Sequence, residues 1–143
     1  MSNFSSVLIT QRVVYVSDIG ETRDSIDHRL VEWVIKIGAL PKLMPNNLGA
    51  MIDTWLDELQ PSAILLSGGN NIGEFPERDK TEFIIIKYAK KYKIPLLGIC
   101  RGAQMLAYEN GCEIIPVKDH VRTDHSLIGK EVVMGLLPQE VNS

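Results

Sequence analysis

The sequence has 143 residues and a mass of 16.0 kDa, which is enough for one domain with a buried core. Hydrophobic residues make up 45% of it and charged residues 23%, a globular composition that excludes an intrinsically disordered chain. The 15 basic and 18 acidic side chains give a formal net charge of −3, which excludes a strongly basic surface for nucleic acid.

Short apolar runs alternate along the chain with stretches whose apolar residues recur at helical spacing. In chain order, the pattern predicts a strand at 7–10, a polar connection, a helix at 25–37, a strand at 40–44, a helix at 48–59, a strand at 63–66, a helix at 79–92, a strand at 95–99, a helix at 100–110 and a strand at 113–117. We interpret Arg78, Asp79 and Glu82, near the start of the third helix, as ordinary charge at a helix N-terminus.

This alternation of strands and helices predicts βαβ units, and therefore an α/β fold with a doubly wound, mainly parallel sheet and helices on both faces. No repeat or linker interrupts the chain, so we expect a single domain over residues 1–143. Sites in such sheets lie at the carboxyl ends of the strands. The two glycine-bearing turns, 67–71 and 98–102, both fall at strand ends of this kind.

The most specific motif is Gly98-Ile99-Cys100-Arg101-Gly102, between a predicted strand and a predicted helix. A nucleophile on a tight strand-to-helix turn needs small residues two positions to either side, because the chain doubles back there. The N-terminus of the following helix favours a thiolate at Cys100, and the backbone N–H of Arg101 can donate to an oxyanion. Cys112 has no such surroundings, and we interpret it as a packing residue.

A second glycine motif, Ser67-Gly68-Gly69-Asn70, follows the apolar run at 63–66. Its glycines can turn a backbone N–H toward the same reaction centre and complete an oxyanion hole. The residue order of a phosphate-binding P-loop is absent from it. Taken by itself, the motif is more typical of a tight turn that needs glycine only for its backbone angles.

Together, residues 65–70 and 95–104 resemble the class I glutamine amidotransferase family, and more narrowly its γ-glutamyl hydrolase branch, where an Arg-Asp pair like Arg78-Asp79 lies between the two motifs. The N-terminal part is similar to the γ-glutamyl-CDP-amidate hydrolases of bacterial capsule phosphoramidate synthesis. The residues that carry this narrower similarity are Thr10-Gln11-Arg12, Arg23-Asp24, Asp27, Trp33, Gly38, Pro41 and Pro45-Asn46.

The resemblance implies a flavodoxin-like domain that hydrolyses a γ-glutamyl amide of a small-molecule substrate without a cofactor or metal. Cys100 would attack the amide carbonyl and form a thioester, and water would then release glutamate. The backbone amides of Gly69 and Arg101 would hold the oxyanion. Gln104 and His120 would contact the substrate.

The sequence departs from the family at the general base, which relatives carry in a late His-x-Glu segment. None of its histidines, His28, His120 and His125, is followed two residues later by Glu. We therefore expect the domain to lack its C-terminal part. We interpret His120 and His125 as surface loop residues, with a substrate contact as the alternative for His120. A metal site built from these two histidines and Asp124 is the least favoured interpretation.

Two alternatives to a free-standing hydrolase stay open. The chain is a glutaminase subunit that supplies ammonia to a separate synthase, or it is a non-catalytic ligand-binding or regulatory protein. The apolar runs are too short to span a bilayer, and the first residues do not resemble a signal peptide. The two cysteines form no C-x-x-C pair. From these features and the net charge, we expect a cytoplasmic protein that contacts neither membrane nor nucleic acid.

Overall fold

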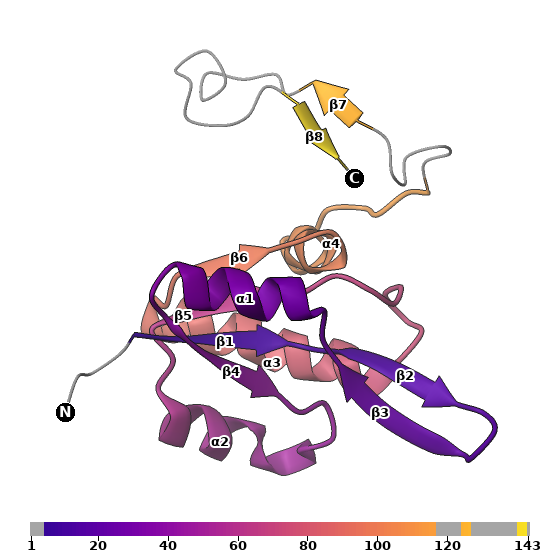
Figure 1. The fold of residues 1–143 in the computed structure, drawn as a ribbon, viewed down its shortest axis with the longest axis horizontal. Coiled ribbons are helices and arrows are strands. Elements are labelled where there is room, and N and C mark those ends of the chain that lie inside the picture. Colours follow the sequence, from indigo (N-terminus) through magenta and orange to yellow (C-terminus); the bar gives the residue numbers. More distant parts are fainter. Residues whose placement is uncertain (1–4, 117–123, 127–139, 143) are drawn as a thin grey trace. The chain divides into compact units, whose positions relative to one another are not determined.

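A computed structural model describes residues 5–116, 124–126 and 140–142 (Figure 1). The chain divides into two compact units, residues 1–113 and residues 114–143. The first unit carries the central sheet and its helices. In the second, β7 (Asp124–Ser126) pairs antiparallel with β8 (Glu140–Asn142).

The first unit is built on a four-stranded sheet in the order β4-β1-β5-β6. Its strands are β1 (Ser6–Thr10), β4 (Leu40–Met44), β5 (Ala63–Leu66) and β6 (Leu96–Gly98). Every neighbouring pair runs parallel, which confirms the predicted parallel sheet. The two strands expected at 40–44 and 63–66 have the bounds that the apolar pattern predicts. β5 and β6 end in register, Leu66 opposite Gly98, so the loops after them are neighbours.

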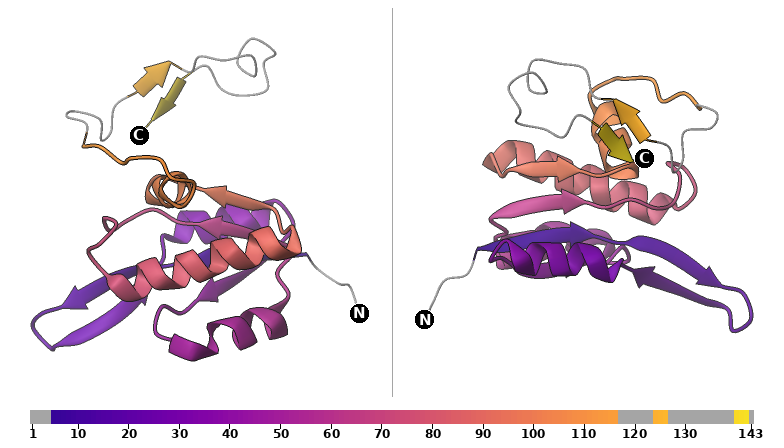
Figure 2. Two further views of the ribbon diagram at one scale, coloured as in Figure 1. Left: turned by 180° about the vertical axis from the view of Figure 1, so that it is seen from behind. Right: turned by 45° about the horizontal axis from the view of Figure 1, so that its top comes forward.

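Helices cover both faces of this sheet, as the doubly wound prediction requires (Figure 2). The helices are α1 (His28–Lys36), α2 (Ile52–Leu59), which a 3₁₀ turn η1 (Gly49–Met51) precedes, α3 (Pro76–Tyr92) and α4 (Arg101–Glu109). On one face, Val34 of α1 packs on Val7, Ile9 and Leu65. On the other, α2, α3 and α4 pack on Leu8, Ile64 and Leu66 through Leu56, Ile86 and Met105.

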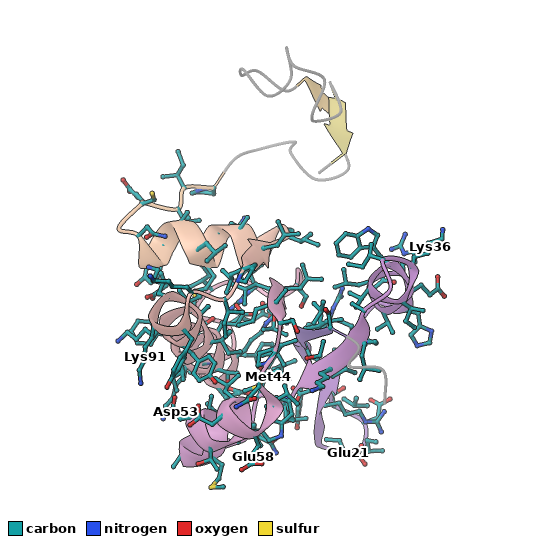
Figure 3. The ribbon with its side chains drawn as sticks, turned by 90° about the vertical axis from the view of Figure 1, so that its left-hand side faces the viewer. Glu21, Lys36, Met44, Asp53, Glu58 and Lys91 are labelled. Carbon is teal, nitrogen blue, oxygen red and sulfur yellow. The ribbon has the colours of Figure 1, made fainter. Side chains whose placement is uncertain are left out.

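The core therefore has two apolar layers, one on each side of the sheet, while most charged side chains face outward. Met44 at the end of β4 is fully buried, and Figure 3 shows it inside the unit, with Glu58 and Lys91 at the outside. Alternate residues of β1 enter opposite layers, since successive side chains of a strand point to opposite faces. This is why β1 and β5, which are buried on both faces, appear in the sequence as mainly apolar runs.

A β-hairpin stands where the sequence predicts only a polar connection. β2 (Arg12–Val16) pairs antiparallel with β3 (Glu21–Ser25), and Gly20 closes the turn with a φ of +67°. Figure 1 shows the hairpin extending from the carboxyl end of β1. Most of its residues are exposed and only Val13 is buried, so it lacks the apolar pattern by which a buried strand is recognised.

Three helix starts and one strand differ from the sequence-based prediction. The helix predicted at 48–59 begins at Ile52, after the 3₁₀ turn η1. α1 begins at His28 rather than near residue 25, because the Asp27 carboxylate caps it by accepting from the Arg29 N–H at 2.9 Å. α3 begins three residues earlier than expected, with Pro76 at its first position. The strand predicted at 113–117 is wrong for residues 113–116, which form no strand; Val117 lies outside the described residues. No helix in the described ranges is long and apolar enough to cross a membrane.

Candidate active site

Cys100 lies on a strained turn between β6 and α4. It is the N-cap residue of α4, with φ of 52° and ψ of −115°, and it is exposed. A non-glycine residue at positive φ costs about 1–3 kcal/mol and persists only where the surrounding structure imposes it. The Ile99 N–H donates to the Leu66 carbonyl at 2.9 Å, and the Gly102 N–H donates back to the Ile99 carbonyl at 2.8 Å. These bonds hold Cys100 at the apex of the turn.

The two glycines that flank Cys100 are required by close backbone contacts, as the sequence predicts. A Cβ on Gly98 would lie 2.6 Å from the backbone of Gly102. A Cβ on Gly102 would lie 2.2 Å from the carbonyl oxygen of Leu66. Both positions are far inside van der Waals contact, so any side chain there would push α4 away from the sheet. The turn is therefore a nucleophile elbow in its geometry.

The glycine loop after β5 lies directly beside this turn. A Cβ on Gly68 would lie 3.3 Å from the Cβ of Cys100 and 3.9 Å from its sulfur. Gly69 has a φ of +81° and Asn70 a φ of +60°, so the loop needs unusual backbone angles at both positions. Among residues 5–116, the backbone N–H groups of Gly69 and Arg101 meet no hydrogen-bond acceptor. The two predicted motifs thus meet, with free donors in both.

Arg78 of α3 fixes the orientation of the glycine loop. Its guanidinium donates to the carbonyl oxygens of Ser67 at 2.9 Å and Gly68 at 3.1 Å, and also to that of Gly69. In a trans peptide unit the C=O and the N–H point in opposite directions. Because Arg78 holds the Gly68 carbonyl, it turns the N–H of Gly69 away from α3.

Asn70 ties the same loop to the base of the hairpin. Its side-chain oxygen accepts from the Val13 N–H at 2.8 Å, and its side-chain nitrogen donates to the Val13 carbonyl at 3.0 Å. Arg78 also donates to the Asn70 oxygen, at 2.9 Å. The loop is therefore held from α3 and from β2 at once.

A buried cluster of ion pairs lies beneath the loop and the turn. The Glu82 carboxylate pairs with Arg78 at 3.2 Å and with Arg101, and Arg101 also pairs with Asp79. Arg78 and Glu82 are fully buried and Arg101 is 1% exposed. Burial lowers the pKa of Arg78, and the Glu82 charge opposes that change. The interpretation of Arg78, Asp79 and Glu82 as ordinary charge at a helix end is therefore wrong.

Thr10 joins this cluster to the sheet. Its hydroxyl donates to the Glu82 carboxylate at 2.9 Å and accepts from the Ser67 N–H at 2.9 Å. The first residue of the glycine loop and the first residue of α4, Arg101, thus depend on one carboxylate. The sequence indicates the Arg78–Glu82 pair through the Arg-Asp-x-x-Glu spacing, which puts both side chains on one face of the helix. Only the fold shows that this face is buried.

The structure does not place the side chains of the remaining predicted residues in the contacts around Cys100 and the glycine loop. Gln104 is exposed on α4, and its N–H donates to the Cys100 carbonyl at 3.1 Å. His120 lies outside the described residues, and of His125 the structure describes only the backbone, in β7. Cys112 is exposed, so its interpretation as a packing residue is wrong.

A cavity of about 420 Å³ opens beside the glycine loop. Ser67, Gly68 and Ile99 line it on the side of Cys100, and residues of β2, β3 and α1 line the rest, among them Arg12, Asp27 and Arg29. Hydrogen bonds from Arg29 lower the pKa of Asp27 to about 2, and the Arg12 charge contributes in the same direction. Asp27 is therefore ionised at neutral pH.

Residues 18–141 match the family described as glutamine amidotransferase class-I. The chain is 30% identical over 131 residues to γ-glutamyl-CDP-amidate hydrolase of Campylobacter jejuni subsp. jejuni serotype O:2, covering 86% of this chain and 64% of that protein. It is 33% identical over 132 residues to a subunit of the glutamine-hydrolysing GMP synthase of Thermoplasma acidophilum, covering 90% and 60%. A GMP synthase of Streptococcus pneumoniae is 29% identical over 119 residues. The chain thus spans under two thirds of the length of these relatives.

Proposed function

The chain belongs to the class I glutamine amidotransferase family, and we propose that it hydrolyses a γ-glutamyl amide bond with Cys100 as the nucleophile. The observation that carries the proposal is the position of Cys100. The residue lies at positive φ on a turn between two glycines that close backbone contacts require. Beside it is a second glycine loop, whose Gly69 N–H has no acceptor among the described residues. A packing cysteine needs neither the strain nor the neighbours.

In the proposed reaction, the thiolate sulfur of Cys100 attacks the γ-carbonyl carbon and forms a C–S bond, while an electron pair moves to the carbonyl oxygen. The C–N bond then breaks, and the leaving nitrogen takes a proton from a general acid or from water. Water next attacks the thioester carbon and the C–S bond breaks. Glutamate leaves, and the thiolate is regenerated with release of a proton.

The backbone amides of Gly69 and Arg101 are the proposed donors to the oxyanion. Each N–H lacks an acceptor among the described residues. Arg78 positions the Gly69 amide through the Gly68 carbonyl, and Glu82 positions Arg101 through its side chain. Donors fixed before the reaction need no reorganisation when charge develops, which is the main source of their effect. The N-terminus of α4 adds positive potential at Cys100. Gln104 and His120 remain proposed substrate contacts.

The substrate we propose is glutamine or an N-substituted γ-glutamyl amide such as the amidate named for the Campylobacter jejuni relative. A second candidate is a glutaminase that supplies ammonia to a separate synthase, which the match to a GMP synthase subunit favours. In the first case the protein that contains the chain releases glutamate without a synthase. In the second, release from glutamine needs the synthase.

The test is glutamate release by the wild type, Cys100→Ser and the control Cys112→Ser. We expect Cys100→Ser to lose the activity and Cys112→Ser to keep it, because the two exposed cysteines differ in their surroundings rather than in access. Activity in Cys100→Ser would refute the nucleophile. Release by the wild type only after a synthase is added would favour the second candidate, and binding of γ-glutamyl compounds without release would favour a non-catalytic protein.

A further inference from the structure

The carboxylate of Glu82 divides its two oxygens between the two halves of the site. Oε1 accepts from the Thr10 hydroxyl at 2.9 Å and from Nε of Arg78 at 3.2 Å, and both of those residues bind the glycine loop. Oε2 accepts from the guanidinium of Arg101, the first residue of α4. Glu82 is fully buried and takes no chemical step in the reaction proposed above. A buried carboxylate is costly unless its hydrogen bonds and charge partners offset the loss of water.

Within the described residues, the side chain of Arg101 is anchored only by carboxylates of α3. Its guanidinium pairs with Glu82 and Asp79, and its buried Nε meets no acceptor there. The contact of Gly102 with the Leu66 backbone limits how closely α4 approaches β5, but a repulsive contact cannot draw the helix in. The ion pair with Glu82 supplies attraction at the first residue of α4.

The glycine loop depends on the other oxygen of Glu82 through a directional chain of hydrogen bonds. A carboxylate only accepts, so the Thr10 hydroxyl gives its proton to Glu82 and turns a lone pair toward the Ser67 N–H, which donates to it at 2.9 Å. The same oxygen holds Nε of Arg78, whose terminal nitrogens donate to the loop carbonyls. The orientation of the loop and the position of α4 are therefore both set from one carboxylate.

We infer that Glu82 is the positioning residue that fixes the Gly69 and Arg101 amides relative to each other, so that both donate to one oxyanion. The inference rests on the proposed hydrolysis by Cys100, and it gives Glu82 no contact with the substrate. An oxyanion forms twice in that reaction, once when the thiolate attacks the amide and once when water attacks the thioester. Glu82 therefore acts on both steps.

Glu82→Gln tests the need for two acceptor oxygens with little change in side-chain size. A glutamine has one oxygen, so whichever way its amide turns, the NH₂ group faces a donor, either Arg101 or the pair Thr10 and Arg78. With γ-glutamyl-p-nitroanilide as substrate, we expect kcat to fall about 10²-fold with little change in KM, the effect of misplacing one oxyanion donor. The control is Glu77→Gln, on the exposed first turn of the same helix. An unchanged kcat, or a rise in KM alone, would overturn the inference.

A double variant separates positioning from charge balance. In the wild-type cluster two guanidinium groups, Arg78 and Arg101, face two carboxylates, Asp79 and Glu82, so Glu82→Gln leaves one buried cation uncompensated. Glu82→Gln/Arg101→Met restores the balance and keeps the backbone N–H at position 101. We expect urea denaturation to show that stability is regained relative to Glu82→Gln, while kcat stays low because the ion pair no longer draws α4 toward α3. Recovery of kcat together with stability would assign Glu82 to charge balance alone and overturn the inference.

Hydrogen exchange tests the placement of α4 without catalysis, and therefore separates this inference from the proposed function. The Gly102 N–H donates to the Ile99 carbonyl at 2.8 Å, at the start of α4, whereas the amide of Leu8, buried in a strand with partners on both sides, reports global unfolding. In the double variant we expect the Gly102 amide to exchange about tenfold faster or more relative to Leu8, and in Glu77→Gln no change. An equal ratio in all the proteins would refute the positioning role. Faster Gly102 exchange in the double variant of a protein whose wild type has no hydrolase activity would support that role while refuting the reaction.

Discussion

Gly102 and Leu66 are in backbone contact: a Cβ on the glycine would lie 2.2 Å from the carbonyl oxygen of the leucine. The first turn of α4 therefore rests on the end of β5 itself. Leu66 is the last residue before the glycine loop, so this contact sets the distance between the loop and the Cys100 turn. Each half of the site is positioned by the backbone of the other.

Gly102→Ala tests this contact through stability. In an open helix such a change raises the free energy of unfolding by about 0.5–1 kcal/mol. Here we expect it to fall by about 1–3 kcal/mol, because the new methyl group overlaps the Leu66 backbone. Urea denaturation monitored by circular dichroism measures the change. A gain in stability would show that α4 can move away from β5 at little cost.

Cys100 and Cys112 stand near opposite ends of α4, and both are exposed. A thiolate is stabilised at a helix N-terminus and disfavoured near the carbonyls at the other end. We therefore expect iodoacetamide at neutral pH to label Cys100 much faster than Cys112. Peptide mass spectrometry over time gives both rates. Equal rates would contradict the electrostatic argument.

Arg78→Lys keeps the charge but loses the planar group that reaches three successive carbonyl oxygens. The lysine still pairs with Glu82, so we expect a folded protein whose glycine loop no longer holds its donor in one orientation. If the Gly69 amide holds the oxyanion, kcat falls about 10²-fold while KM changes little, as for loss of one oxyanion donor. Lys87→Arg, on the exposed side of the same helix, is the matched control. A rise in KM with constant kcat would assign Arg78 to substrate binding instead.

Asp27 gives a prediction for acid conditions. Its pKa is lowered from 3.8 to about 2 by hydrogen bonds from Arg29, so the unfolded chain binds the proton first as the pH falls. The stabilisation by the Asp27 charge is complete well above pH 3.8 and is lost as the pH approaches 2. Asp27→Asn keeps a capping oxygen without the charge. We expect the wild type to be the more stable protein at neutral pH and this difference to shrink in acid. A difference independent of pH would exclude the ion pair as its source.

The sequence predicts well those elements whose signal is local. The bounds of β4 and β5 follow from apolar runs, and the Cys100 turn follows from two glycines at fixed spacing. The hairpin is missed because its strands are stabilised by pairing with each other and bury only Val13. The burial of Glu82 is missed because it depends on Arg101, whose position only the fold determines.

Asn70 makes the hairpin and the loop beside Cys100 a single mechanical unit. Its side chain imitates a strand partner for Val13, and its oxygen is shared with Arg78. A displacement of the hairpin therefore acts on the glycine loop through Asn70, as well as on the sheet through the chain that joins β1 to β2. A molecule that binds the exposed hairpin and displaces it would change the geometry around the Cys100 sulfur, because the single side chain of Asn70 joins the hairpin to the adjacent loop.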